Sequence, residues 1–348
     1  MRICILGATG LVGRELLPLI ARAWPDASLE LHASRARTLT IDGAPREVHA
    51  ATRLEGKDAP RGDLAFVALD DDYSARYVPR LLELGYRVVD KSNTYRLDPA
   101  VPLTVAGVND GLVDDSTRLV ANPNCTTIPL TLVVAPLLRR FGLEELVVST
   151  YQAISGAGLA TVDAFLTDSR DGYARTDRLG REFAASGYAG NVVPHSGKTD
   201  DSGFSSEERK LLHEGRRILD RAALPIVAQC CRVPVLVGHY QQVWIRLGRG
   251  DALTPAALEA FYREEAAPYL RLLPGAAGDG LSALACLEHR DDVLFGRIRS
   301  DPRDPGRSFC LTVVADNLRL GAATNAVRIA SRWFAVADEA LRAPGAQV

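Results

Sequence analysis

The sequence predicts an α/β fold in which a Rossmann-type dinucleotide-binding domain is joined to a second α+β domain with a mixed sheet. In the first part of the chain, short apolar runs alternate with helical patterns, which is typical of parallel strands joined by crossover helices. A glycine-rich turn directly follows the first of these runs. From about residue 127, longer β-type runs follow one another with fewer helices between them, and this favours a mixed or antiparallel sheet.

The predicted elements divide the chain into two domains. In the first domain, strands are expected over residues 3–6, 29–33, 64–69 and 87–90, and helices over residues 11–24 and 74–84. In the second, a helix is expected over residues 128–141 and strands over residues 145–153, 226–235, 240–247 and 308–315. A last helix, predicted over residues 321–340, is expected to return to the first domain, and the stretch 191–206 is expected to be a loop. The predicted boundaries are therefore 1–127 plus 320–348 for the dinucleotide-binding domain and 128–319 for a catalytic and dimerisation domain.

Composition and charge exclude several classes of function. At 348 residues the chain is long enough for two domains with sizeable cores. Its formal net charge of -2 speaks against nucleic acid or an anionic membrane as a partner. No apolar run is long enough for a transmembrane helix, and no signal-peptide pattern opens the chain. The six cysteines form no zinc-binding pattern, so we expect free thiols, no metal site and a location in the cytoplasm.

The glycine-rich turn predicts a cofactor loop, because it follows the first strand and opens the first helix. Glycines let the backbone approach a pyrophosphate, which the positive end of the helix attracts. The spacing is G-x-x-G-x-x-G rather than G-x-G-x-x-G, so the prediction depends mainly on the position of the turn between a strand and a helix. The alternative is a glycine turn that binds no ligand. The residues expected to contact the cofactor here are Gly7, Thr9, Gly10, Leu11, Val12 and Gly13.

The residues after the second predicted strand indicate which nicotinamide cofactor binds. Proteins that read NAD place a carboxylate there to hold the ribose 2′-hydroxyl. Here the strand is followed by Ser34 and Arg35, with no carboxylate nearby. A hydroxyl and a guanidinium suit a 2′-phosphate, so the sequence favours NADP over NAD. The alternative is that Arg35 is a solvated loop cation.

Cys125 is the candidate nucleophile. It lies between a Pro-Asn turn and an apolar run that is expected to be helical, so backbone N–H groups at the helix start favour negative charge on the thiol. A thiolate is the nucleophilic form of cysteine, and such surroundings lower its pKa. The alternative for a single cysteine is a buried, inert thiol.

Three other segments carry the groups that thiol chemistry on an activated acyl group requires. Arg232 and His239 lie seven residues apart and bracket one strand or bend. The strand that contains Gln152 ends in a polar, glycine-rich turn. The run 92–96 follows a strand end, where ligands of open parallel sheets bind. Together with the glycine loop, these segments suggest that a thioester forms on Cys125 and accepts a hydride.

The chain resembles the aspartate-β-semialdehyde dehydrogenase family over nearly its whole length, and the matching stretches occur in the family's order. They are GATGLVG at 7–13, the arginine segment that ends at Arg96, NPNCTT at 122–127, STYQAISGAG at 149–158, NVVPHSG at 191–197, EERKLLHEGRRIL at 207–219, CRVPVLVGH at 231–239, GRIRSD at 296–301 and ADNLRLGAATNAVRIA at 315–330.

The resemblance implies a role for each matching position. Cys125 would be the acylated nucleophile, His239 its acid/base partner and Gln152 a residue that orients the substrate. Arg232 would bind the substrate carboxylate and Glu214 its ammonium group. The remaining implied contacts are Arg96, Asn93, Asn124 and Arg217 for the substrate and its phosphate, and Ser155, Gly156, Gly158, Asn317 and Gly321 for the cofactor.

Four departures from the family pattern bear on the choice of substrate. Arg217 replaces a lysine that commonly contacts phosphate, and the two cations differ in reach and donor geometry. Tyr240-Gln241 replaces Ser-Glu after the histidine, which removes a carboxylate and adds bulk beside the imidazole. Asp70-Asp71-Asp72 replaces a small loop, and these carboxylates must point to solvent or cap the next helix. Lys91 adds a cation near Arg96.

The activity implied by the resemblance is NADP-dependent reductive dephosphorylation of L-aspartyl-4-phosphate to L-aspartate-4-semialdehyde, through a thioacyl intermediate on Cys125, within lysine, threonine and methionine biosynthesis. The partners would be this acyl phosphate, inorganic phosphate and further copies of the chain in a homodimer or homotetramer. One alternative is a same-fold reductase of an N-acylglutamyl phosphate, a carrier-bound acid or an acyl-CoA. Another is an inactive paralogue that serves as a dimer partner, which predicts loss of Cys125, His239 or Gln152, although all three are present.

Overall fold

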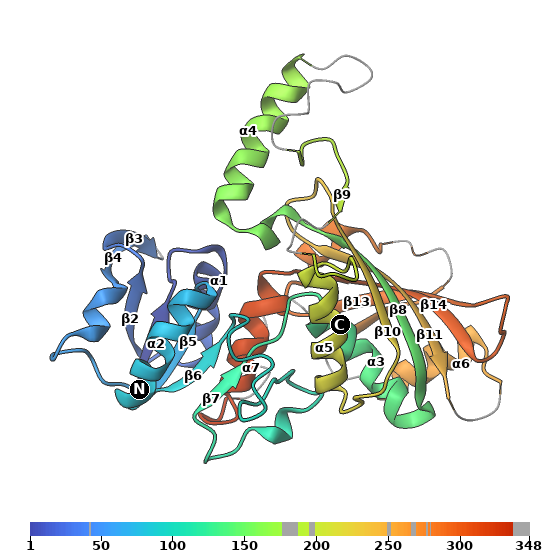
Figure 1. Cartoon of the computed structure of the whole chain (residues 1–348), viewed down its shortest axis with the longest axis horizontal. Helices are drawn as coiled ribbons and strands as arrows, with labels where there is room; N and C mark the ends of the chain where they lie inside the picture. Colours follow the sequence, from blue (N-terminus) through green and yellow to red (C-terminus); the bar gives the residue numbers. More distant parts are fainter. Residues whose placement is uncertain are drawn as a thin grey trace. The chain divides into compact units, whose positions relative to one another are not determined.

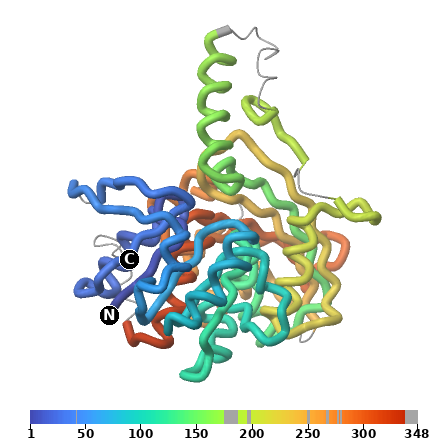
Figure 2. The backbone as a smooth tube through the Cα atoms, turned by 60° about the vertical axis from the view of Figure 1, so that its left-hand side comes forward, coloured from blue at the N-terminus to red at the C-terminus, as the bar shows by residue number. Residues whose placement is uncertain are grey.

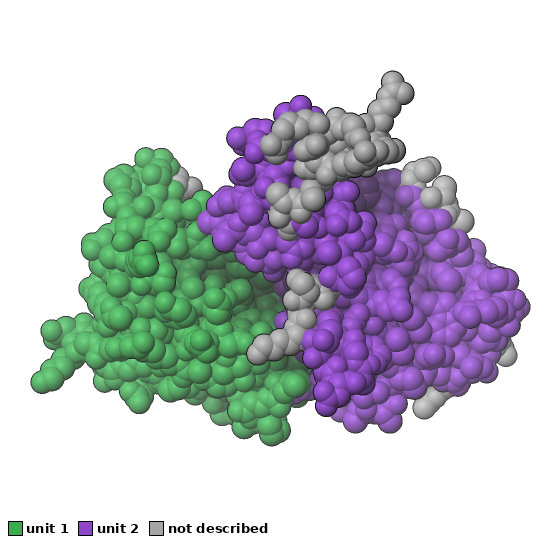
Figure 3. Space-filling model, turned by 45° about the horizontal axis from the view of Figure 1, so that its top comes forward, with its two compact units in different colours: residues 1–124, 322–348 green, residues 125–321 purple. Residues whose placement is uncertain are grey.

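The computed structural model describes residues 1–336, apart from 42, 176–186, 195–198, 249–251, 266–268, 276–277 and 279. Two compact units make up the chain (Figure 3). The first contains residues 1–124 and the segment from Ala322 on, and the second contains Cys125–Gly321. The chain therefore passes from one unit to the other directly before the candidate nucleophile and again directly after Gly321.

The first unit contains a seven-stranded sheet with the order β3-β4-β2-β1-β5-β6-β7. All neighbouring strands are parallel except the β3–β4 hairpin. The strands are β1 (Arg2–Leu6), β2 (Ser28–Ala33), β3 (Arg37–Ile41), β4 (Ala44–Ala50), β5 (Leu64–Val67), β6 (Arg87–Asp90) and β7 (Leu119–Ala121), and the helices are α1 (Leu11–Ala23), α2 (Asp71–Glu83) and α7 (Asn325–Ala330), with short 3-10 turns at Ala51–Glu55 and Asp110–Leu112.

The core of this unit lies on both faces of the sheet, as parallel sheets require. Ile3 and Ile5 of β1 pack in one cluster with residues of α1 and α7. The alternate β1 residues, Cys4 and Leu6, pack in a second cluster with α2. Because side chains alternate along a strand, this central strand is apolar at every position from Ile3 to Leu6.

The second unit contains a mixed seven-stranded sheet with the order β12-β13-β14-β11-β8-β10-β9. The β8–β10 and β12–β13 pairs are parallel and the others are antiparallel. The strands are β8 (Leu143–Gln152), β9 (Val193–Pro194), β10 (Ile226–Arg232), β11 (His239–Leu247), β12 (Leu270–Leu273), β13 (Val293–Ser300) and β14 (Ser308–Ala315), and the helices are α3 (Thr127–Phe141), α4 (Leu159–Arg175), α5 (Ser206–Ile218) and α6 (Pro255–Glu265), with 3-10 turns η3 (Ile154–Ala157) and η5 (Ala283–Leu287) and a π-helix at Arg319–Thr324.

Helices α3, α5 and α6 cover one face of this sheet (Figure 1). Along β11, the residues that face these helices are buried and the residues between them are half-buried.

Figures 1 and 2 show α4 standing away from the sheet, in pale green. Among the described residues, no helix is both long and apolar enough to cross a membrane.

The predicted fold class is confirmed, but several elements differ from the prediction. Strands β7, β12 and β13 were not assigned from the sequence. The β3–β4 hairpin was not expected, because most of its residues are exposed and few of them are apolar. Helices α4, α5 and α6 were not assigned from the sequence. The helix predicted over residues 321–340 is confirmed at α7, in the first unit, but is shorter than predicted: a π-helix comes first, α7 ends at Ala330, and residues 331–333 form a turn. Residues 337–340 lie outside the described part of the chain, as do residues 195–198 of the predicted loop, in which β9 forms a short strand.

Candidate active site

Cys125 and His239 form a close pair in the second unit. Cys125 lies two residues before Thr127, the first residue of α3, and His239 is the first residue of β11. Their Sγ and Nε2 atoms are 3.2 Å apart. The imidazole is 1% exposed, whereas the cysteine is partly accessible. The pair therefore combines a reachable sulfur with a histidine that bulk water does not solvate.

The backbone of one residue, Ala153, orients both the histidine and the arginine of the candidate site. The backbone N–H of Ala153 donates to Nδ1 of His239 at 3.0 Å. The carbonyl oxygen of the same residue accepts from Nη1 of Arg232 at 2.6 Å. All three residues are at most 5% exposed, so solvent does not compete for these bonds.

Backbone hydrogen bonds explain how residues seven apart in the sequence meet here. After β10 ends at Arg232, the chain runs beside the end of β8 and η3: Val233 N–H donates to the Gln152 carbonyl at 3.0 Å, and Ile154 N–H donates to the Val235 carbonyl at 2.8 Å. Gly238 then turns the chain into β11 with φ +99, and a Cβ on it would lie 2.1 Å from the Ala283 oxygen. Only glycine fits this turn.

Gln152 lies next to Arg232 in the parallel β8–β10 pair. Its side chain is 1% exposed, and its Nε2 donates to the Thr150 hydroxyl at 3.2 Å. The last residue of β8 is thus brought to the same end of the sheet as the Cys125–His239 pair, since β11 pairs with β8 in antiparallel register.

The η3 turn packs directly onto these groups. A Cβ built on Gly156 would lie 3.0 Å from Nη1 of Arg232 and 3.3 Å from Nε2 of His239. Gly156 therefore lies against the side chains of Arg232 and His239. Gly158, which ends the turn with φ +94, is in open space within the described part of the chain.

Asn317 connects two parts of the site. Its Oδ1 accepts from the Gly238 N–H at 3.0 Å, and its Nδ2 donates to the Ser155 hydroxyl at 2.9 Å. It is 2% exposed. One amide thus holds both the turn before His239 and the η3 turn, in addition to the cofactor contact that the resemblance implies.

Gly321 lies beside the candidate nucleophile, in the π-helix, a rare form that is often found at functional sites. A Cβ on Gly321 would lie 3.0 Å from the Cβ of Cys125 and 3.1 Å from its carbonyl oxygen. The Gly321 N–H donates to the Asp316 carbonyl at 3.0 Å. The Asp316 carboxylate, fully buried, accepts from two backbone N–H groups that follow it and from Nε of Arg290 at 2.7 Å. Asp316 was not identified from the sequence.

Glu214 and Arg217 lie on α5, which packs on β10. Glu214 is 2% exposed, and Arg217 is half-buried one turn later, so the two share a helix face. A capping box between Ser205 and Glu208 starts the helix, and Glu208 also accepts from the Cys230 N–H at 3.0 Å. The helix is thereby tied to the strand that ends at Arg232.

In the first unit, Arg96 is buried and held by three oxygens. Its guanidinium donates to the Asn122 carbonyl at 3.0 Å, to Oδ1 of Asn93 at 3.1 Å and to the Lys91 carbonyl at 2.5 Å. The exposed Asn93 in turn donates to the Asp71 carboxylate through its backbone and its side chain. Hydrogen bonds therefore hold the loop after β6 in place, and the Lys91 carbonyl accepts one of them.

Asp90, the last residue of β6, has a carboxylate that water does not reach. Burial raises the pKa of the Asp90 carboxyl, which is 0% exposed. The hydroxyls of Ser74 and Ser92 donate to it at 2.7 and 2.6 Å and partly offset that effect. Asn124, 7% exposed, ends the same unit.

The glycine loop of the first unit is closely packed. Gly7 has φ +100, and a Cβ on it would lie 2.6 Å from the Ala68 oxygen. A Cβ on Gly13 would lie 2.1 Å from the Gly7 oxygen, whereas one on Gly10 would be 3.4 Å from that oxygen. Thr9, Leu11 and Val12 are partly exposed at the start of α1, where free N–H groups and the helix dipole favour a phosphate. Ser34 and Arg35 are exposed directly after β2.

Two of the departures from the family pattern take a definite place in the structure. Tyr240 does not crowd the imidazole, because neighbouring residues of a strand point to opposite faces. Its ring instead packs edge-on against Tyr151 at 5.9 Å. Gln241, on the face of His239, donates to the Thr126 carbonyl at 2.8 Å and so contacts the nucleophile loop.

The three successive aspartates lie at the start of the next helix, as the sequence analysis required. Asp70, Asp71 and Asp72 are all exposed and lie at the start of α2, where negative charge is favourable. Their negative charge complements the helix dipole, and the Asp71 carboxylate also accepts from the backbone and the side chain of Asn93.

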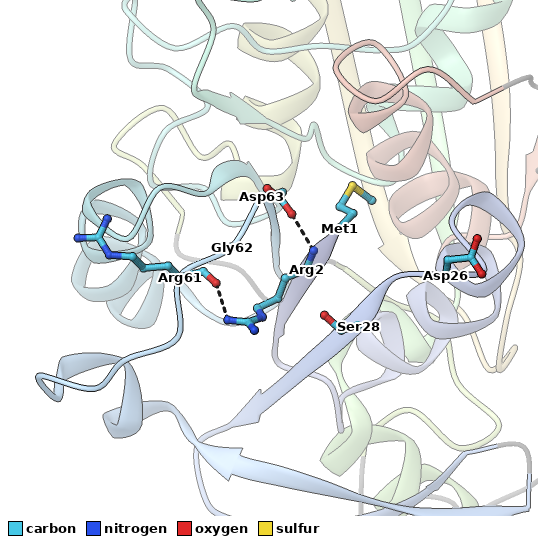
Figure 4. Close-up of a pocket in the computed structure, with 7 residues that line it drawn as sticks. All are labelled: Met1, Arg2, Asp26, Ser28, Arg61, Gly62 and Asp63. Carbon is cyan, nitrogen blue, oxygen red and sulfur yellow. Dashed lines mark hydrogen bonds between the residues drawn. The ribbon is translucent and has the colours of Figure 1, made fainter.

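A separate surface hollow of about 540 Å³ lies at the amino end of β1, opposite the glycine loop (Figure 4). Its polar groups bond to each other: the Arg2 N–H donates to the Asp63 carboxylate at 2.7 Å, and the Arg2 guanidinium donates to the Arg61 carbonyl at 2.9 Å. It contains none of the sequence-predicted site residues. Within the described ranges, no group of three or more His, Cys, Asp or Glu side chains is arranged to hold a metal ion.

Replacing Gly156 with alanine is expected to lower kcat/KM by roughly 10- to 100-fold, because small displacements of catalytic groups are costly. The new methyl group would push on Arg232 and His239, and both are held by Ala153. The measurement is steady-state kinetics beside a thermal melt. Gly111→Ala, whose Cβ meets nothing within 4 Å, is the matched control. Equal kinetics for the two variants would contradict this packing.

Comparison with known proteins shows which family the chain is similar to. The semialdehyde dehydrogenase NAD-binding domain model matches residues 2–116, and the semialdehyde dehydrogenase dimerisation domain model matches residues 134–320. Aspartate-semialdehyde dehydrogenase of Aquifex aeolicus is 34% identical over 337 residues, covering 94% of this chain and 96% of that protein. The enzyme of the same name from Mycolicibacterium smegmatis is 35% identical over 359 residues, covering 95% of this chain and 98% of its own.

A solved structure gives the same result. The crystal structure of aspartate semialdehyde dehydrogenase II from Vibrio cholerae, complexed with ASA, has a TM-score of 0.84 and 29% sequence identity to this chain. The likeness covers 96% of this chain and 98% of the other. The two domain models, the relatives and this structure span both units. The chain belongs to the aspartate-semialdehyde dehydrogenase family.

Proposed function

We propose that the protein catalyses the NADP-dependent reductive dephosphorylation of L-aspartyl-4-phosphate to L-aspartate-4-semialdehyde. The observation that carries the proposal is the 3.2 Å contact between Cys125 Sγ and His239 Nε2, beside an arginine that is held by the same residue, Ala153, as the imidazole. Relatives that share 34% and 35% identity over nearly the whole chain have this activity in their names.

The proposed chemistry has two stages on one sulfur. The Cys125 thiolate attacks the acyl carbon, an S–C bond forms, and the C–O bond to phosphate breaks with its electron pair leaving on phosphate. A nicotinamide cofactor, held by the glycine loop, would supply the hydride that the resulting thioester accepts. Collapse of the adduct breaks the C–S bond, releases the aldehyde and restores the thiolate. One hydride and one proton are consumed, and the proton ends on phosphate.

The residues of the second unit are assigned to the amino-acid part of the substrate. Arg232, with its guanidinium oriented by Ala153, would bind the α-carboxylate, and the buried Glu214 would bind the α-ammonium. Gln152 and Asn124 would orient the acyl group, and Arg217 would contact phosphate. A simple diacid thioester has no ammonium group, so the presence of Glu214 favours an amino-acid substrate.

In the first unit, the residues fit a dinucleotide. The glycine loop leaves no room for side chains at Gly7 and Gly13 and places the start of α1 at its end, as a pyrophosphate site requires. Ser34 and Arg35 would hold the 2′-phosphate of NADP. Arg96, held by three oxygens, and Asn93 would bind a phosphate oxyanion.

Replacing Arg35 with alanine is expected to raise the KM for NADP by about 10- to 100-fold and to leave the KM for NAD nearly unchanged, because a charge-assisted hydrogen bond contributes about 1.5–3 kcal/mol. The exposed Arg37, two residues further on, provides a control variant of the same charge. Equal losses with both cofactors would show that the 2′-phosphate site lies elsewhere.

The substrate is tested with a panel of aldehydes in the oxidative direction. The purified enzyme is incubated with NADP, phosphate and, in separate assays, aspartate, N-acetylglutamate and succinate semialdehydes. We expect kcat/KM for the aspartate compound to exceed that for the others by at least about 100-fold, since Arg232 and Glu214 pair only with the free amino acid. A preference for N-acetylglutamate semialdehyde would support the alternative, a reductase of another acyl phosphate.

We further propose a homodimer or homotetramer in the cytoplasm. The match to a dimerisation domain supports association, and the uncovered face of the second sheet exposes Tyr151 and Val227, at 38% and 45%. All six cysteines are free, which accords with a reducing compartment. Light scattering of the purified protein tests the assembly.

A further inference from the structure

Gln241 reaches the loop that carries Cys125 from the same face of β11 as His239, because residues two apart in a strand point to the same side. It is 0% exposed, and its Nε2 donates to the Thr126 carbonyl at 2.8 Å. The Cys125 sulfur lies 3.2 Å from His239 Nε2. Two successive residues of the loop are therefore contacted by two side chains of one strand.

The strand that carries both side chains is held on each side. β11 pairs with β8 and with β14, and Gln241 is in register with Thr150 and Val313, which are uncharged and fully buried. The loop is packed from a further side, because a Cβ on Gly321 would lie 3.0 Å from the Cβ of Cys125. A substitution at position 241 is therefore expected to move the loop rather than the strand.

We propose that Gln241 is a positioning residue: its amide N–H holds the Thr126 carbonyl and thereby keeps the Cys125 sulfur in contact with the imidazole. His239 keeps the acid/base role that the resemblance implies. The inference rests on the proposed function only for its assay of turnover, since the contact itself involves no substrate.

This role requires a neutral hydrogen-bond donor. Gln241 stands where the family pattern has a glutamate. An ionised carboxylate has no hydrogen to donate to the Thr126 carbonyl, and its charge would oppose ionisation of the thiol. In the described part of the site, the titratable or charged groups on this side are the Cys125 thiol, His239 and Arg232. An amide thus holds the loop without adding a negative charge beside the thiolate.

The other amide atom argues against a purely structural role. Oε1 of Gln241 is buried and has no hydrogen-bond partner within the described residues. An unpaired buried acceptor is unfavourable, whereas an apolar side chain of similar length, such as methionine, has no such atom. Packing alone would therefore favour an apolar residue here, and the donor N–H explains the glutamine.

The first test measures the reactivity of the thiol without substrate. Wild type and Gln241→Met, which has a similar reach but no donor, are treated with iodoacetamide at neutral pH, and alkylation of Cys125 is followed by mass spectrometry of its peptide. We expect the rate to fall at least about fivefold, because a thiolate held beside an imidazole reacts fastest. Thermal melts confirm that both proteins are folded. A folded Gln241→Met with the wild-type rate would overturn the proposal.

Gln242→Met is the matched control. Gln242 is the next residue of β11, is half-buried and points to the opposite face of the sheet. Its amide donates to the Tyr240 hydroxyl at 3.0 Å rather than to the loop. Alkylation of Cys125 is expected to keep the wild-type rate in this variant, and an equal loss in both variants would contradict the assignment to Gln241.

The second test uses Gln241→Glu, which can donate only while its carboxyl is protonated. Burial raises the pKa of such a carboxyl, so we expect the alkylation rate relative to wild type to fall at least about fivefold between about pH 6 and about pH 9, as the carboxyl ionises. The same ratio for Gln241→Met is not expected to fall. A ratio for Gln241→Glu that stays constant or rises would refute the proposal, even if Gln241→Met failed to fold.

Turnover separates this inference from the proposed function. For Gln241→Met, kcat with aspartate semialdehyde is expected to fall at least about tenfold while KM stays within about threefold, because Arg232 and Glu214, and not residue 241, are assigned to the substrate head group. A rise in KM without loss of kcat would instead place Gln241 in substrate binding and overturn the positioning role. If the alkylation results hold but no aspartate semialdehyde is oxidised, the proposed function fails and the positioning role stands.

Discussion

Replacing Cys125 with alanine is expected to lower kcat by at least about 10⁴-fold, because removal of the nucleophile from a catalytic unit leaves only binding effects. NADP affinity is expected to stay unchanged, since the glycine loop and Arg35 belong to the other compact unit. Phosphate-dependent oxidation of aspartate semialdehyde measures the first effect, and fluorescence titration of NADPH measures the second.

Cys310 supplies the control for this prediction. It is a partly buried cysteine on β14 of the same unit, and burial raises the pKa of its thiol. Burial likewise raises the pKa of the Cys230 and Cys286 thiols to about 12, so these remain protonated at neutral pH. Cys310→Ala is therefore expected to retain full activity. Turnover that persists in Cys125→Ala but not in Cys310→Ala would refute the covalent route.

Replacing Gly13 with alanine is expected to abolish cofactor binding and to lower the free energy of unfolding by about 1–3 kcal/mol, since overpacking against rigid backbone has that cost. The new Cβ would lie 2.1 Å from the Gly7 oxygen and 2.8 Å from the Ala8 Cα. The start of α1 must therefore move away from the loop that is expected to hold the pyrophosphate. Thermal or urea unfolding of the cofactor-free protein, followed by NADPH titration, measures both effects.

Gly10 is the matched control in the same loop. It has φ -74 and ψ 170, which any residue can adopt, and its Cβ would be 3.4 Å from the nearest atom. Gly10→Ala is therefore expected to cost less than about 1 kcal/mol, the scale of an N-cap change. If Gly13→Ala were as stable as Gly10→Ala, the loop would be looser than the close packing of Gly7 and Gly13 indicates.

Much of the fold was predictable because its strands are strongly patterned. β1 is apolar at successive positions and is followed by glycines, and β6 and β14 lie where their apolar runs indicated. The β3–β4 hairpin was missed because exposed, polar strands carry little hydrophobic signal. The C-terminal helix was overestimated because periodicity continues beyond Ala330, whereas Trp333 and Phe334 pack against the first core cluster from a turn.

The candidate site shows a similar division. Cys125, Gln152, Arg232 and His239 could be named from the sequence, because each is a reactive or charged residue in a specific motif. Ala153 could not, since its contribution is a peptide N–H and a carbonyl, and every residue other than proline has both. Asp316 was also missed, because a buried aspartate that bonds backbone N–H groups carries no pattern of its own.

The sequence by itself therefore determined the fold class and the family resemblance and supplied the candidate reactive groups, since apolar periodicity, glycine spacing and motif order are all local properties of the chain. Only the tertiary structure decided how those groups are oriented. The Sγ–Nε2 distance, the partner of Nδ1 and the packing of Gly156 and Gly321 all join residues far apart in the sequence. Such contacts depend on strand register and on backbone hydrogen bonds, which no single residue type encodes.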